Sequence, residues 1–138
     1  MSRRLTREKV FTTLFQADIT GESPVLVFER EMGEDVSLAS REREYAARVT
    51  RGVAENLLDL DAYLKPYLKK NWELKRISVT DRVILRLALY ELLNMEEIPP
   101  AVSINEAVEL AKKFSDEKSA SFINGLLDKA YRDLIKGE

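Results

Sequence analysis

The hydrophobic residues of this chain recur mainly at spacings of three and four, which is the period of a helix with one buried face. The first such stripe consists of Val10, Phe11, Leu14 and Phe15. It predicts a helix from about Thr6 to Ile19, and Gly21 follows where a glycine commonly ends a helix. Ser23 and Pro24 have the order of a cap and a first helical residue, so they predict a short second helix that Gly33 closes.

A longer stripe predicts a third helical region that starts near Ser37 or Ser40. Its apolar members are Tyr45, Val49, Val53, Leu57, Leu60, Leu64 and Leu68. Pro66 would cost about 3 kcal/mol inside a helix, so we expect a break upstream, between about Asn56 and Asp59. Gly52 indicates close packing of the backbone against a neighbouring element.

The most hydrophobic segment begins at Ser78, which can cap a helix, and runs to about Met95. Its polar surface is only a narrow stripe of Arg82, Arg86 and Tyr90. A helix with so wide an apolar surface must pack on several neighbours, and we expect it to be central.

Two further helices are predicted after this central one. Pro99 and Pro100 predict an extended connection, and a capping box over residues 103–106 then opens a helix that ends near Phe114. The last helix is predicted over about residues 117–135. It includes Asn124 and Gly125, because the apolar residues on both sides keep helical rather than alternating spacing.

These elements predict an all-α fold in a single domain of residues 1–138. We expect a compact bundle of about six to seven helices in two packed sub-bundles, approximately 1–70 and 71–138. The joint is expected near a basic loop over residues 69–76. No internal repeat is visible in the chain, which disfavours a solenoid.

Composition narrows the possible chemistry. The chain contains no cysteine and no histidine, which excludes disulfides and zinc–thiolate sites and removes the commonest general base near neutral pH. Glu106 and Glu109 share a helix face, but di-metal sites in helix bundles also use a histidine three residues after a glutamate. We therefore expect no enzyme, no metal, no cofactor and no small-molecule substrate.

The chain carries no segment typical of a membrane or export signal. No stretch approaches the roughly 18 apolar residues of a membrane-spanning helix, and no apolar run follows the basic start. We expect a cytoplasmic protein without a membrane partner.

Charge alternates along the chain, although its net charge is only −2. The first nine residues are net basic through Arg3, Arg4, Arg7 and Lys9, and a second basic patch consists of Lys65, Lys69, Lys70, Lys75 and Arg76. An acidic stretch over residues 18–44 separates the two. The pattern allows one basic surface on an acidic body, as in RNA-binding proteins, and equally allows charges scattered over solvated helix faces.

The second half of the chain carries a specific set of motifs. They are DRVILRLALYEL at 81–92, Ile98-Pro99, SINEAVELAK at 103–112 and FINGLLDK at 122–129. In this order and with these gaps they closely resemble the NusB family of bacterial transcription antitermination factors. The first half agrees more loosely, through its arginine-rich start, Gly52-Val53 and Lys65-Pro66-Tyr67.

The resemblance implies two helical sub-bundles, binding to boxA RNA, and a heterodimer with the ribosomal protein NusE within the transcription elongation complex. By position, it implies that RNA is bound by Arg3, Arg4, Arg7, Lys118 and Phe122, and that the protein partner is bound by Phe15 and Asp81. Phe15 stands where some relatives have a tyrosine, so no hydroxyl is available there.

Other interpretations remain open for individual positions. Periodicity alone places Phe15 in the core, Phe122 could pack under Tyr131, and Asp81 suits the positive end of a helix dipole. For the whole chain, one alternative is a domain related to that of ribosomal-RNA cytosine methyltransferases, which the length and the missing cysteines disfavour. The other is a helical adaptor or homodimer module without an RNA role.

Overall fold

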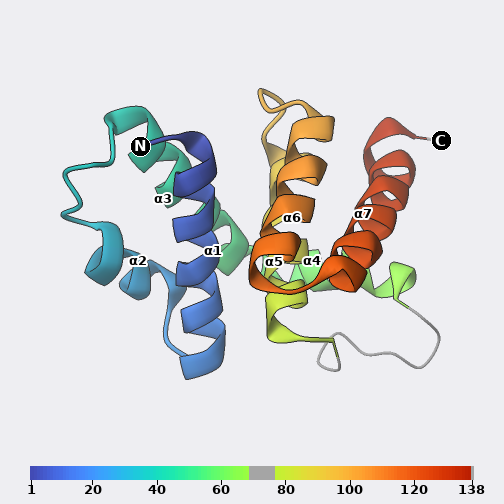
Figure 1. Cartoon of the computed structure of the whole chain (residues 1–138), viewed down its shortest axis with the longest axis horizontal. Helices are drawn as coiled ribbons and strands as arrows, with labels where there is room; N and C mark the ends of the chain where they lie inside the picture. The colour runs from blue at the N-terminus through green and yellow to red at the C-terminus, as the bar shows by residue number, and fades with distance from the viewer. Residues whose placement is uncertain (69–76, 138) are drawn as a thin grey trace. The chain divides into compact units, whose positions relative to one another are not determined.

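The computed structural model describes residues 1–68 and 77–137, which form two compact units, Met1–Asn56 and Leu57–Glu138. Every regular element within these residues is helical, which confirms the all-α prediction (Figure 1). The second basic patch falls mostly on residues 69–76, which lie outside the described residues. The structure divides the chain after Asn56 rather than near residue 70, because α4 (Leu57–Leu64) packs on α5 of the second unit.

The first unit is a three-helix unit in which each helix contacts the other two. It consists of α1 (Arg3–Thr20), α2 (Pro24–Met32) and α3 (Ser40–Glu55). The hydroxyl of Ser2 accepts a hydrogen bond from the backbone N–H of Leu5, so α1 begins at Arg3, earlier than the hydrophobic stripe indicated. Gly21 ends α1 with φ 79°, a left-handed conformation that favours glycine.

The predicted break between the third and fourth helices is confirmed. Asn56 follows the last residue of α3, and its side-chain amide donates to the carbonyl of Gly52 at 2.8 Å. The chain then restarts as α4, and Pro66 lies in a short 3-10 turn, η1 (Lys65–Tyr67).

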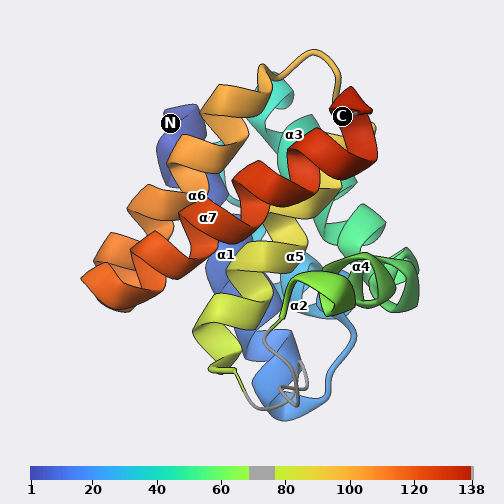
Figure 2. The same cartoon turned by 90° about the vertical axis from the view of Figure 1, so that its right-hand side faces the viewer.

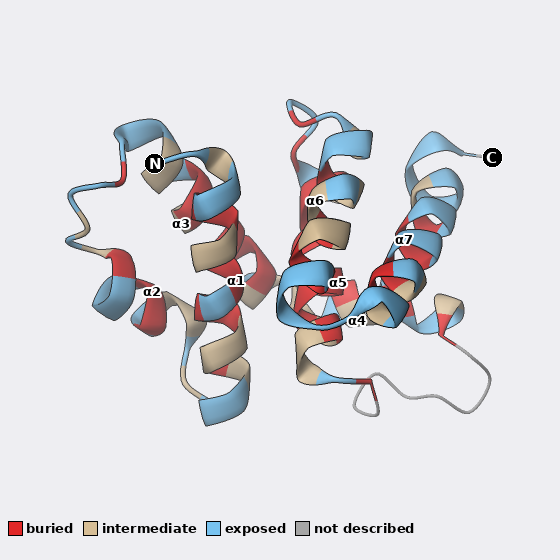
Figure 3. Cartoon of the chain, in the orientation of Figure 1, coloured by how far each residue is buried: buried red, intermediate tan, exposed pale blue. Residues whose placement is uncertain are grey.

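The second unit is built around α5 (Val79–Asn94), which is buried along most of its length (Figure 3). It packs against α4, α6 (Pro100–Phe114) and α7 (Glu117–Tyr131), and Figure 2 shows α6 and α7 together on one side of it. Arg86 on α5 forms a two-pronged ion pair with Asp61 on α4, at 2.7 and 2.9 Å. The burial of α5 and its packing against three other helices confirm that it is the expected central helix.

The predicted start of the sixth helix was wrong. Pro99 is the extended cap and Pro100 the first helical residue of α6, so Ser103 lies inside the helix instead of capping it. The Ser103 hydroxyl donates to the buried Glu91 carboxylate of α5 at 2.8 Å. A proline at the first helical position needs no N–H partner, so the helix could begin before the capping box.

The last helix follows the prediction closely, and Asn124 and Gly125 lie within it. It runs as α7 to Tyr131 and continues as a π-helical turn, η3 (Arg132–Lys136), which ends at Gly137.

Candidate nucleic-acid interface

The arginine-rich start is part of a helix. Arg3 is half-buried, and its Nε donates to Glu42 of α3 at 2.8 Å. Its guanidinium also lies 4.1 Å from the centre of the Tyr45 ring, within cation–π range. The hydrogen bond from Arg3 is the main reason that the pKa of Glu42 lies below its ordinary value.

The three arginines of this start have different surroundings. Arg7 is only 3% exposed, and its guanidinium lies 5.4 Å from the same Tyr45 ring. Arg4 is exposed. Arg4 and part of Arg3 therefore lie on the surface, whereas Arg7 lies largely inside the first unit.

The corner between α6 and α7 carries the two other positions that the resemblance assigned to RNA. Asp116 caps α7 by accepting from the backbone N–H of Ser119 at 2.8 Å. Lys118 is exposed in the first turn, and Phe122 follows it by four residues on the same face of the helix. Phe122 is half-buried, whereas Ile123 next to it is fully buried.

The alternative of Phe122 packing under Tyr131 has no support. In the part of the chain that the structure describes, no ring contact joins these two residues. The core face of α7 is formed by Ala120, Ile123, Leu126, Leu127 and Ala130. Phe122 lies beside this face, where part of its ring surface can meet a ligand.

Asp81 lies at the start of α5, where Ser78 accepts a hydrogen bond from its backbone N–H at 3.1 Å. It is only 8% exposed, and its Oδ2 accepts from the Ser119 hydroxyl at 3.0 Å. Its Oδ1 is one of two buried side-chain atoms without a hydrogen-bond partner among the described residues. Burial raises the pKa of Asp81, although the Ser119 hydrogen bond partly offsets this. Asp81 is therefore more than a first-turn acid that suits the helix dipole.

Phe15 lies on the edge of the first unit's core. Its ring is half-buried and tilted by 38° against the ring of Phe11, with 5.9 Å between the ring centres. Phe11 is 2% exposed and belongs to the core itself. Phe15 thus contributes to packing on one side and keeps part of its ring available on the other.

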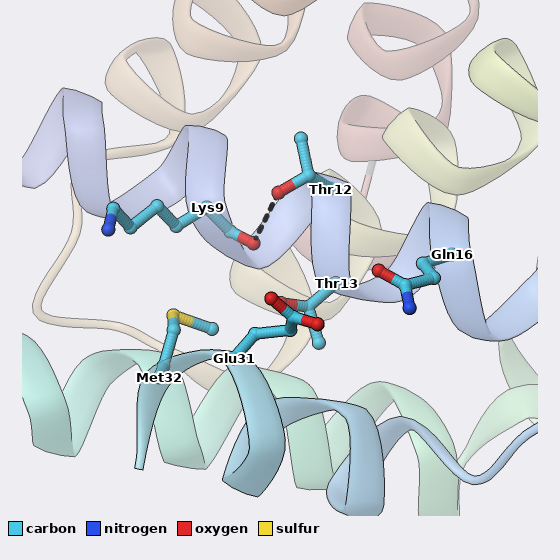
Figure 4. A pocket seen from close by; sticks show the side chains of 6 residues that line it. All are labelled: Lys9, Thr12, Thr13, Gln16, Glu31 and Met32. Atoms are coloured by element: carbon cyan, nitrogen blue, oxygen red, sulfur yellow. Dashed lines mark hydrogen bonds between the residues drawn. The ribbon is translucent and has the colours of Figure 1, made fainter. Parts of the chain in front are cut away.

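A polar recess of about 270 Å³ lies between α1 and α2 (Figure 4). It is lined by Lys9, Thr12, Thr13, Gln16, Glu31 and Met32. The Lys9 ammonium pairs with Asp35 at 2.8 Å, and the Thr12 hydroxyl donates to the Lys9 carbonyl at 3.0 Å. These two polar groups therefore already have partners, and none of the predicted site residues lines the recess.

Three residues that organise the candidate interface are not among the predicted site residues, namely Glu42, Tyr45 and Ser119. The spacing of Tyr45 identified it as a core residue, but its contact with two arginines depends on how α1 packs against α3. Ser119 follows Asp116 by three residues, which is the spacing of a capped first turn and the one available signal.

The described residues contain neither a cluster of three potential metal ligands nor a helix long and apolar enough to cross a membrane.

The chain is similar to known proteins over nearly its whole length. A model of the NusB family matches residues 4–132. The transcription antitermination protein NusB of Rubrobacter xylanophilus is 44% identical over 142 residues, which cover 100% of this chain and 99% of that protein.

Two solved structures have the same fold. The structure of T. maritima NusB aligns with a TM-score of 0.90 and 40% identity, over 96% of this chain and 92% of that one. A crystal structure of the antitermination factors NusB and NusE in complex with dsRNA aligns with a TM-score of 0.85 and 27% identity, over 96% of this chain and 99% of that one. With a family match over most of its length, this chain belongs to the NusB family.

Proposed function

We propose that this chain is a transcription antitermination factor that binds boxA-type RNA together with the ribosomal protein NusE and supports transcription of ribosomal RNA by the elongation complex. Its relatives carry the name transcription antitermination protein. One solved structure of similar fold contains NusB and NusE with RNA.

Each unit contributes its own RNA contacts, the exposed arginines of α1 in the first unit and the α6–α7 corner in the second. The observation that carries the proposal is the pairing of Lys118 with Phe122 on one face of α7. A cation can meet a phosphate while the partly exposed ring stacks on a base, which is how proteins commonly hold single-stranded RNA. Arg3 and Arg4 add positive charge for the backbone phosphates.

The protein partner contacts Asp81 and Phe15. Asp81 Oδ1, which is buried and has no hydrogen-bond partner among the described residues, supports this role. A buried carboxylate oxygen without a donor is costly, and a cationic side chain of the partner would satisfy it once the atoms that cover it move aside. The exposed part of the Phe15 ring offers an apolar contact.

The protein acts by binding alone, as a single domain in the cytoplasm and without a cofactor. The absence of histidine and cysteine from the sequence supports a role without catalysis.

A binding titration tests the proposal. Fluorescently labelled boxA RNA and a scrambled RNA of the same composition are titrated with the protein, alone and with an equimolar amount of NusE. We expect preference for boxA and tighter binding of the mixture. Equal affinity for both RNAs in the presence of NusE would contradict the proposal and favour an adaptor without an RNA role.

A further inference from the structure

Ser119 joins the start of α5 to the corner between α6 and α7. Its hydroxyl donates to Asp81 Oδ2 at 3.0 Å and accepts from the Ser115 hydroxyl at 2.9 Å. Its backbone N–H donates to the capping carboxylate of Asp116 at 2.8 Å. Ser119 therefore links the first turn of α7 to the start of the central helix by a hydrogen bond.

Asp81, on one side of this link, can respond to a bound protein. The carboxylate is 8% exposed and its Oδ1 lacks a hydrogen-bond partner among the described residues. The negative charge is shared between the two oxygens. Because Oδ1 is buried, a cationic donor of the partner reaches it only if the atoms that cover it move on binding. Such a donor draws charge away from Oδ2 and alters the hydrogen bond from Ser119.

The other side of the link carries the candidate RNA contacts. Lys118 directly precedes Ser119, and Phe122 lies one turn further along the same helix. Both side chains project from a hydrogen-bonded helical backbone, so a shift of Ser119 displaces them together.

We propose that Ser119 is a positioning residue that couples the binding of a cationic protein surface at Asp81 to the binding of RNA at Lys118 and Phe122. The inference rests on the proposed function, because it takes Asp81 as a partner contact and the first turn of α7 as an RNA contact. Coupling of this kind is reciprocal, so RNA also strengthens protein binding by the same factor.

The test compares the RNA affinity of the whole chain with and without saturating NusE. The coupling is measured as a ratio, the dissociation constant without NusE divided by the dissociation constant with NusE. A purely structural role of Ser119 would leave this ratio unchanged. Ser119→Ala removes the hydroxyl and keeps the N–H that Asp116 caps. We expect the ratio to fall at least about fivefold in Ser119→Ala.

Three further variants make the result specific. Ser119→Thr keeps a hydroxyl and should retain the coupling. Ser121→Ala makes the same change at an exposed position of α7 and should retain the wild-type ratio. Ser119→Cys replaces the hydroxyl with a weak donor of similar size, and it gives the same readout if Ser119→Ala melts below the assay temperature.

The outcomes separate the inference from the proposed function. A wild-type ratio in a folded Ser119→Ala or Ser119→Cys variant overturns the inference and leaves the proposed function standing. A wild-type protein whose RNA affinity is the same with and without NusE also overturns it. If the wild type binds no boxA RNA, alone or with NusE, the proposed function itself fails.

Discussion

The start of α1 and the corner between α6 and α7 both place basic side chains near an aromatic ring, but they arrange them in opposite ways. On α1 the ring is Tyr45, which is 3% exposed and lies under the guanidiniums of Arg3 and Arg7. At the corner the ring is Phe122, which is partly exposed, and Lys118 lies on the same helix face.

We propose different tasks for the two regions on the basis of this difference. A buried ring cannot stack on a base, so we expect the first region to contribute charge held in place by α3. A partly exposed ring can stack, so we expect the second region to contribute contact with bases as well as charge. Changes in the first region should alter salt dependence, and changes in the second should alter the preference for one RNA sequence over another.

The largest expected effect concerns the protein partner, whose proposed contact Asp81 lies beside the second region. Asp81→Lys should weaken NusE binding by about 2–5 kcal/mol, because it reverses a buried charge at the interface. Calorimetric titration of NusE into the variant measures this. Asp59→Lys is a matched control, since Asp59 is an exposed acid in the first turn of α4.

The stability of this variant needs separate measurement. The helix dipole alone predicts a loss of about 0.3–1 kcal/mol. Because Asp81 is 8% exposed, a lysine there has to leave a buried site, and we expect a larger loss. Asp81→Asn keeps the volume and should fold normally while binding NusE weakly. Wild-type NusE affinity in both variants would place the partner elsewhere.

The next largest effect tests base stacking at the corner. Phe122→Ala should weaken boxA binding by about 1–3 kcal/mol and reduce the preference over scrambled RNA. Tyr131→Ala serves as the control, because it removes another half-buried aromatic ring from the end of the same helix. If Phe122→Ala instead lowers the melting temperature far more than Tyr131→Ala does, Phe122 is a packing residue and the comparison of the two regions fails.

A smaller effect distinguishes surface arginines from the buried one. A double variant with Arg3→Ala and Arg4→Ala should have a weaker salt dependence of RNA binding. The slope of log affinity against log salt concentration should fall in magnitude by about 1.4, because each lost contact with a single-stranded phosphate removes about 0.7. The preference for boxA should remain. Arg7→Ala should chiefly lower the melting temperature, because Arg7 is 3% exposed. An unchanged salt slope in the folded double variant would remove the α1 start from the RNA site.

The smallest effect concerns Glu42, which holds Arg3. Glu42→Gln removes a negative charge beside a candidate phosphate contact, and we expect boxA affinity to rise by roughly two- to threefold at low salt. Glu55→Gln, on the exposed end of the same helix, should have no such effect. A fall in affinity would show that Glu42 orients Arg3 for RNA.

The same variant has a predictable pH dependence. Because Arg3 lowers the pKa of Glu42 in the folded protein, the carboxylate stabilises the fold above its ordinary pKa of 4.5. This stabilisation is lost as the pH falls through the lowered pKa. Glu42→Gln should therefore show a weaker loss of melting temperature on acidification, measured by circular dichroism.

Local signals predicted most of the fold. Ser23 with Pro24, Ser78 with Asp81, and the break at Asn56 all depend on neighbours in sequence, and the structure confirms each of them. The start of α6 was mispredicted because the capping box at Ser103 competes with Pro100 as a helix start. The contact that resolves this, from Ser103 to Glu91, joins residues far apart in sequence.

The candidate site was less predictable for the same reason. The spacing of Lys118 and Phe122 places them on one helix face without further information. The burial of Arg7 follows from the packing of α1 on α3, and the link from Asp81 to Ser119 follows from the packing of α5 on α7. A pattern of neighbouring residues contains neither of these contacts.

NMR titration of the isotopically labelled protein with boxA RNA tests the central claim most directly. The account predicts that amide signals of two segments shift on RNA addition, residues 3–4 of α1 and residues 118–122 of α7, and that scrambled RNA shifts only the first segment strongly. Shifts confined to other described surfaces, such as the recess between α1 and α2 or the exposed face of α4, would contradict it.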